Sequence, residues 1–193
     1  MTESSQHHLI PHSTEAEEAL LGAILINPDS YHEVEPFLQT ADFYLHRHRS
    51  IWGAIGRLHE RHSPVDFLTV CEELDQAGQL ENVGGSTYLT GLINRVPTSL
   101  HAEAYGHIVE QAAVRRRLLE AASQVAKLAY EESTPLENII DESEKAIFSI
   151  RNRLQSHNQQ PLSEVLGSTY DQAVASSRHT GPLGVPTGYP VLD

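Results

Sequence analysis

Histidine is the residue whose abundance most invites a chemical role, since twelve of the 193 residues are histidines. Neutral imidazole is a common ligand for zinc and other transition metals. His59 and His62 are three residues apart on one expected helix, and His46 and His48 form a second close pair. No His-Glu-x-x-His motif, cysteine pair or carboxylate pattern completes a site. We therefore interpret the histidines as surface residues and predict no metal site.

The sequence carries no catalytic signature. No glycine is followed by lysine, so the phosphate loop G-x-x-x-x-G-K-[ST] is missing, as is the G-x-S-x-G nucleophile elbow. Cys71, the only cysteine, lies on an apolar helix face and is interpreted as a small buried hydrophobe. The adjacent carboxylates Glu72 and Glu73 are expected to be solvated. We predict no catalytic residue and no cofactor in this chain.

Charge and hydropathy limit the partners and the compartment. The net charge is −13, with 13 basic and 26 acidic residues, so polyanions are not attracted overall. Two basic runs, 46–49 and 115–117, each either contact an anion or form a solvated helix face or salt-bridging strip, and we favour the solvated or salt-bridging interpretation. A single cysteine fits a reducing, cytoplasmic compartment. No apolar stretch is long enough for a membrane span.

Helical signals dominate residues 13–100. Apolar residues recur at helical spacing and predict about five short helices, in a small orthogonal bundle after a flexible tail over residues 1–12. Thr14 with Glu17, and Ser30 with Glu33, have the spacing of capping boxes. Proline and glycine are expected to end the helices, at Pro28, Pro64, Gly78, Gly84, Gly85 and Pro97.

Two longer helices are predicted over residues 101–156, joined by a short turn as an antiparallel hairpin. Each has a thin apolar seam with alternating spacings of four and three. The first seam is Ile108, Ala112, Arg115, Leu119, Ala122, Ala126 and Ala129. The second seam is Leu136, Ile140, Ser143, Ile147, Ile150 and Leu154. The predicted fold class is therefore all-α.

A single hairpin cannot bury both sides of its seams, so further packing is expected. The hairpin either folds back on its own bundle or packs against a second copy of the chain, and we favour self-association. The residues predicted to make that contact are Leu119, Ala126, Leu136, Ile140, Ile147 and Ile150.

Residues 157–180 are predicted to be a linker containing a short amphipathic helix. A helix of that length is unstable alone, so it should dock on another domain or subunit. The residues predicted to dock are Leu162, Val165, Leu166 and Tyr170. The glycine- and proline-rich residues 181–193 look like the start of a further domain, which the sequence does not continue.

An ordered set of short motifs resembles the DnaB family of bacterial replicative helicases over residues 11–193. In the bundle these are Pro11, Glu17, Leu21, Gly22, Leu25, Asp42, Phe43, Tyr44, His48, Arg49, Ile51, Leu58, Pro64, Asp66, Thr69, Leu74, Gly84, Gly85, Tyr88 and Leu89. Further along they are Pro97, Thr98, Tyr105, Ile108, Val109, Arg115, Leu119, Gly184, Gly188, Tyr189, Leu192 and Asp193. Each motif is weak alone, and the order makes the set specific.

The resemblance implies a hexameric ring that unwinds duplex DNA 5′ to 3′ with ATP and Mg²⁺. The N-terminal regions would form a collar, a trimer of dimers, that binds primase. The linker helix would dock on the motor domain of the adjacent subunit. Single-stranded DNA would be held mainly by that RecA-like motor, which residues 181–193 would begin.

An adaptor that dimerises through its hairpin, outside replication, is the alternative function. The tail over residues 181–193 discriminates between the two, because an adaptor has no need of a domain entry after its linker. A small metal-dependent hydrolase is a third and poorer hypothesis, since no ligand set assembles in the sequence.

Overall fold

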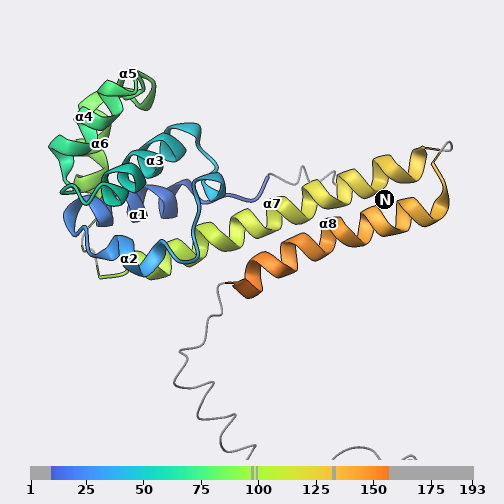
Figure 1. Ribbon diagram of the computed structural model, residues 1–193. Helices are drawn as coiled ribbons and strands as arrows, with labels where there is room; N and C mark the ends of the chain where they lie inside the picture. Colours follow the sequence, from blue (N-terminus) through green and yellow to red (C-terminus); the bar gives the residue numbers. More distant parts are fainter. Residues whose placement is uncertain (1–9, 97, 99, 132–133, 157–193) are drawn as a thin grey trace, which may run out of the picture. The chain divides into compact units, whose positions relative to one another are not determined.

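The computed structural model describes residues 10–96, 98, 100–131 and 134–156 of the chain. Every element in these ranges is helical (Figure 1), which confirms the predicted all-α class. The chain divides into two compact units, Met1–Arg153 and Leu154–Asp193. The predicted linker helix, with Leu162, Val165, Leu166 and Tyr170, lies outside the described residues.

Six short α-helices and one 3₁₀ turn form the bundle within the described ranges. They are α1 (Thr14–Ile26), α2 (Ser30–Val34), η1 (Thr40–Asp42), α3 (His46–Glu60), α4 (Phe67–Gln76), α5 (Leu80–Val83) and α6 (Gly85–Arg95). The sequence predicts about five helices here, and the additional one is the single-turn α5. Gly84 ends α5 in the left-handed conformation, with φ of 109°, which glycine adopts without strain.

Helix α1 is the central element of the bundle and packs against α3, α6 and the long helix α7 (Ala102–Tyr130). Leu20, Leu21 and Ile24 are completely buried. Because neighbours cover it on several sides, α1 is apolar around most of its circumference instead of along one stripe. Burial of each such side chain contributes about 1.5–3 kcal/mol to the stability of the bundle.

Two glycines allow helices of the bundle to approach closely. A Cβ on Gly22 of α1 would lie 2.4 Å from the carbonyl oxygen of Leu92 in α6. A Cβ on Gly106 would lie 2.8 Å from Cγ1 of Val34 and 3.1 Å from the ring of Phe37. A side chain at either position would therefore force neighbouring atoms apart.

The helix starts differ from those predicted by capping-box spacing. Ser13, and not Thr14, is the N-cap of α1, and its Oγ accepts a hydrogen bond of 3.2 Å from the backbone three residues on. Glu17, the predicted capping partner, is buried in the bundle instead. At α2 the N-cap is Asp29, without a side-chain capping bond, and Ser30 is buried. Both predicted capping boxes are therefore wrong, because Glu17 bonds to residues of the bundle and α2 has Asp29 as its N-cap in place of Ser30.

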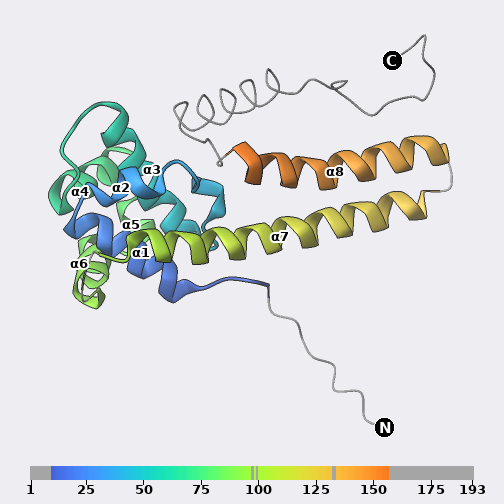
Figure 2. The ribbon, with the colours of Figure 1, turned by 90° about the horizontal axis from the view of Figure 1, so that it is seen from below.

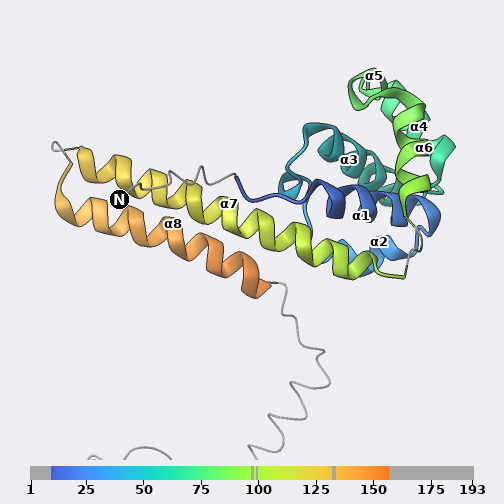
Figure 3. The same cartoon turned by 180° about the vertical axis from the view of Figure 1, so that it is seen from behind.

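Helix α7 (Ala102–Tyr130) belongs to both the bundle and the hairpin. Its N-terminal part buries Ala102, Val109 and Ala113, and the rest extends beyond the bundle with α8 (Leu136–Ser156) running antiparallel beside it (Figures 1, 2 and 3). This confirms the predicted antiparallel hairpin. No helix in the described part of the chain is long and apolar enough to cross a membrane.

Candidate interaction surface on the helical hairpin

The two hairpin helices shield a narrow line of residues on each other. On α8 the shielded residues are Ile139, Ser143, Ala146 and Ile150, spaced by four, three and four. On α7 beyond the bundle they are Ala121, Val125 and Leu128, spaced by four and three. Such spacings place each set on one helical face, and we infer that these two faces are turned toward each other within the hairpin.

An apolar stripe on α8 is left outside that contact. Leu136 is 71% exposed, Ile140 is 50% exposed and Ile147 is 57% exposed. Because a helix turns about 100° per residue, this stripe is centred roughly 70° from the shielded face. Three of the residues predicted for self-association therefore remain available to a partner, on a side of α8 that borders α7.

The predicted α7 residues also lie outside the hairpin contact. Leu119 is 56% exposed and Ala126 is exposed. By the same helical geometry they lie roughly 140° from the face that covers α8. We infer that the two predicted seams do not meet within one chain, because the burial pattern turns a different face of α7, centred on Ala121, toward α8.

Ile150 is placed differently from the other predicted contact residues. It is only 8% exposed, because it lies on the shielded face of α8. It is therefore occupied within the chain and is not free for a second copy. Spacing alone could not separate it from Ile147, since both fit one apolar seam of α8.

The second basic run joins the hairpin to the bundle. Arg117 Nη1 donates to the buried carboxylate of Asp42 at 2.8 Å. Arg116 donates to the carbonyl oxygen of Pro11 at 2.9 Å and also to that of Asp42. Burial is the main cause that lowers the pKa of Arg116. Arg117 thus forms a salt bridge, whereas Arg116 donates to backbone carbonyls, so two of the three arginines make structural contacts.

The first basic run is used inside the bundle in the same way. His48 is completely buried, with Nδ1 2.6 Å from Glu17 Oε2 and Nε2 2.6 Å from the Tyr88 hydroxyl. The Arg47 guanidinium lies 4.2 Å from the centre of the Tyr88 ring. Arg49 donates to a backbone carbonyl of the preceding loop at 2.7 Å. These contacts link α1, α3 and α6.

One carboxylate that was expected to be solvated is instead buried. Glu73 accepts a hydrogen bond of 2.6 Å from Arg57 Nε and another from Arg61, which tie α4 to α3. These two bonds, that from Arg57 first, hold the pKa of Glu73 below its ordinary value. The neighbouring Glu72 is exposed, as predicted.

The remaining chemical candidates of the sequence do not form an active site. Cys71 is half-buried against the core, and burial raises the pKa of its thiol, which disfavours the reactive thiolate. His62 does not join His59 in a cluster of potential ligands. The described residues thus form an all-helical domain whose exposed apolar side chains suit contacts with other proteins.

Comparison with known proteins agrees with that class. A family model for the DnaB-like helicase N terminal domain matches residues 9–111. The chain is 37% identical over its whole length to the replicative DNA helicase DnaC of Bacillus subtilis, and covers 43% of that protein. It is 34% identical to the replicative DNA helicase DnaB of Geobacillus stearothermophilus, again covering 43%. The chain thus spans less than half the length of these relatives.

Solved structures share the fold. The crystal structure of the N-terminal domain of DnaB helicase from Mycobacterium tuberculosis matches with a TM-score of 0.70 at 35% identity, over 73% of this chain and 99% of that one. A DnaB-like replicative helicase, described with its interactions with primase, matches with a TM-score of 0.65 at 24% identity. It covers 94% of this chain and 39% of that one. The chain belongs to the family of DnaB-like helicase N-terminal domains.

Proposed function

We propose that this chain is the N-terminal collar region of a hexameric replicative DNA helicase, and that its copies associate through the α7–α8 hairpin. The observation that carries the proposal is the exposed apolar stripe of Leu136, Ile140 and Ile147 in a domain of this family. Leu119 and Ala126 add a second apolar face on α7.

A second copy of the chain is the occupant that best fits these faces. A hairpin of two antiparallel helices can pack on its own copy about a two-fold axis, so that each apolar stripe meets an equivalent one. Three such dimers would close a hexamer, the assembly that the family resemblance implies. Ile150 is excluded from this interface because it is buried within the chain.

We propose that ATP hydrolysis and DNA unwinding belong to the part of the relatives that this chain does not cover. We infer that ATP and Mg²⁺ bind there, and that single-stranded DNA is held mainly there during 5′ to 3′ unwinding. The net charge of −13 supports this division, since strand binding needs clustered basic residues. Replication in the bacterial cytoplasm would be the setting.

The linker would connect the two parts of the helicase. We propose that residues 157–180 carry an amphipathic helix that docks on the adjacent subunit's motor through Leu162, Val165, Leu166 and Tyr170. Residues 181–193 would then enter the motor domain. Residues 13–100 and 101–156 are proposed as the bundle and the hairpin, with α7 shared between them as described above.

Primase is the proposed partner of the assembled collar. The solved neighbour described with primase motivates this choice, although its 24% identity supports only the common fold. The exposed hairpin residues that are left over after dimerisation offer one surface for such a partner, Leu118 and Phe148 among them. Binding primase does not require this chain to contact DNA.

The test is light scattering coupled to size-exclusion chromatography, on the chain alone and with the C-terminal domain of primase from the same organism. Dimers or hexamers that co-elute with primase are the expected result. A monomer that ignores primase at micromolar concentration would contradict the collar assignment for this chain alone. Self-association without primase binding would favour the alternative, a dimerising adaptor outside replication.

A further inference from the structure

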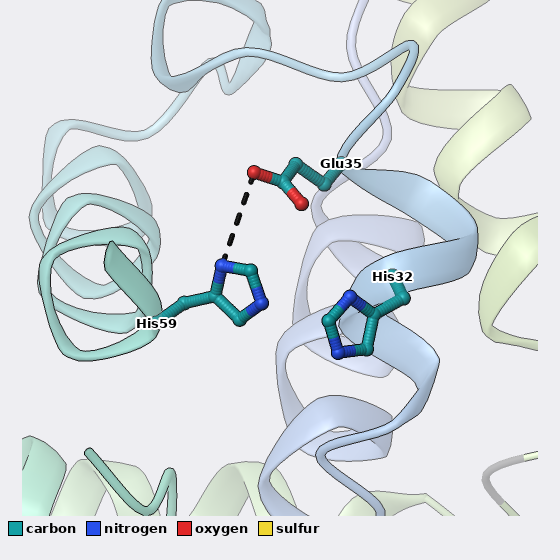
Figure 4. A group of neighbouring side chains, drawn as sticks. All are labelled: His32, Glu35 and His59. Atoms are coloured by element: carbon teal, nitrogen blue, oxygen red, sulfur yellow. Dashed lines mark ion pairs between the residues drawn. The ribbon is translucent and has the colours of Figure 1, made fainter. Parts of the chain in front are cut away.

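Three potential metal ligands from two helices lie together at one edge of the bundle (Figure 4). His32 belongs to α2, Glu35 is the C-cap of that helix, and His59 lies in the last turn of α3. One ligand atom of each lies within 4.8 Å of the others. Among the described residues, no other such group of three occurs.

The separations leave room for an ion between the side chains. His59 Nδ1 and Glu35 Oε1 are 4.0 Å apart, which is too far for a hydrogen bond. Two ligands bound tetrahedrally to zinc at about 2.0–2.1 Å from the metal lie about 3.3 Å from each other. Each pair therefore needs to close by less than about 1.5 Å, and the exposed His32 and Glu35 can rotate to do so.

The backbone already places the ligands on facing surfaces. His32 and Glu35 are three residues apart, so they lie on one side of α2. The rings of His32 and His59 are in edge-to-face contact, with centroids 4.6 Å apart. The ring of Tyr31, 4.9 Å from that of His59, packs beneath it and limits its movement.

The surroundings are negatively charged. Glu60 directly follows His59 in α3, and Glu35 is itself one of the three potential ligands. A cation beside these carboxylates would be attracted. Hard ions such as Mg²⁺ and Ca²⁺ prefer sites made of oxygen ligands, whereas two imidazoles and one carboxylate suit zinc and similar transition metals.

We propose that His32, Glu35 and His59 bind Zn²⁺, with solvent completing a tetrahedral coordination. The ion joins α2, which has no side-chain capping bond, to the C-terminal end of α3. Because the ligands come together only in the folded chain, binding stabilises the bundle by mass action. The role is structural, and it gives a role to His32 and His59, two of the twelve histidines, and to the carboxylate of Glu35.

The test is titration of the metal-stripped chain with zinc chloride by calorimetry, combined with thermal unfolding with and without the ion. One site and a higher Tm in the presence of Zn²⁺ are expected. His32→Ala, His59→Ala and Glu35→Gln should each weaken binding by at least about tenfold and remove the Tm increase, since each deletes a ligand. His62→Asn is the matched control, and it should bind zinc as the unaltered chain does.

A second readout needs no variant of the site. In imidazole nitrogen NMR spectra, sub-stoichiometric Zn²⁺ should shift the signals of His32 and His59 before those of the other histidines. Unchanged zinc affinity in His32→Ala and His59→Ala would overturn the proposal. Zinc-induced shifts confined to histidines outside the cluster would overturn it equally.

Discussion

The bundle and the hairpin differ in how far their polar side chains find partners and their apolar side chains are buried within the chain. In the bundle, even charged groups find partners within the chain, as Glu17, His48 and Tyr88 do. In the hairpin, large apolar side chains such as Ile140 and Ile147 remain about half-exposed. The bundle therefore has a core that is closed within one chain, whereas the hairpin leaves a row of large apolar side chains that another molecule could cover.

The largest expected difference is between two isoleucines. Ile24→Ala removes a completely buried side chain from α1 and should lower the free energy of unfolding by about 2–5 kcal/mol. Ile140→Ala removes a half-exposed one and should cost less than about 1 kcal/mol in the monomer. Urea unfolding at low protein concentration measures both. Equal losses would show that the hairpin is packed like the bundle.

The buried polar network gives the next largest effect. Glu17→Gln keeps the size of the side chain but disturbs its bonds to His48 and to the backbone N–H of Tyr44, 2.5 Å away. A loss of about 1–3 kcal/mol in unfolding free energy is expected from the unsatisfied buried groups. The exposed Glu15, changed to Gln, is the control on the same helix. A neutral Glu17→Gln would mean that the network adds nothing to the stability of the bundle.

Two glycines should respond in opposite directions to alanine. Gly22→Ala forces α1 away from the Leu92 carbonyl and should destabilise the chain by about 1–3 kcal/mol. Gly91→Ala in α6 meets no atom within 4 Å and should stabilise it by about 0.5–1 kcal/mol, because alanine favours the helix. The shift in Tm of each variant measures the effect. A tolerated Gly22→Ala would contradict the close contact between α1 and α6.

The smallest effect is the acid dependence of Glu73. Its pKa is lower in the folded chain than the unfolded value of about 4.3. Its pairing with Arg57 and Arg61 therefore stabilises the fold above about pH 4.3 and is lost as pH falls through the folded pKa. Glu73→Gln should be less stable than the unaltered chain at pH 7, and the gap should narrow in acid. A gap that does not vary with pH would refute this, and the exposed Glu72→Gln serves as control.

The sequence predicts those features of the fold that depend on the local spacing of apolar residues. The helices, the antiparallel hairpin and the all-α class follow from the spacing of apolar residues. Capping at Thr14 was predicted wrongly because the true partner of Glu17, His48, lies 31 residues further along the chain. Asp66 and Thr69 cap the start of α4 reciprocally, and each accepts a 2.9 Å hydrogen bond from the other's backbone N–H. Their three-residue spacing could have predicted this cap.

Long-range placement explains the rest of what the sequence missed. The seam pattern on α7 marks apolar positions, but it does not say which of them face α8, and small alanines on several faces make the choice ambiguous. The His32 and Glu35 pair had a signal in its helical spacing. Their third companion, His59, comes from another helix, so only the fold could bring it beside them.

The central claim is that the exposed α8 stripe joins copies of the chain, and analytical ultracentrifugation tests it directly. Ile140→Asp with Ile147→Asp places two charges on the stripe, whereas Asn138→Asp with Ser149→Asp adds the same charge on the opposite side of α8. The first pair should reduce the assembly to monomers with unchanged helical content, and the second pair should leave the mass of the assembly intact. An assembly of unchanged mass in the first pair would contradict the claim.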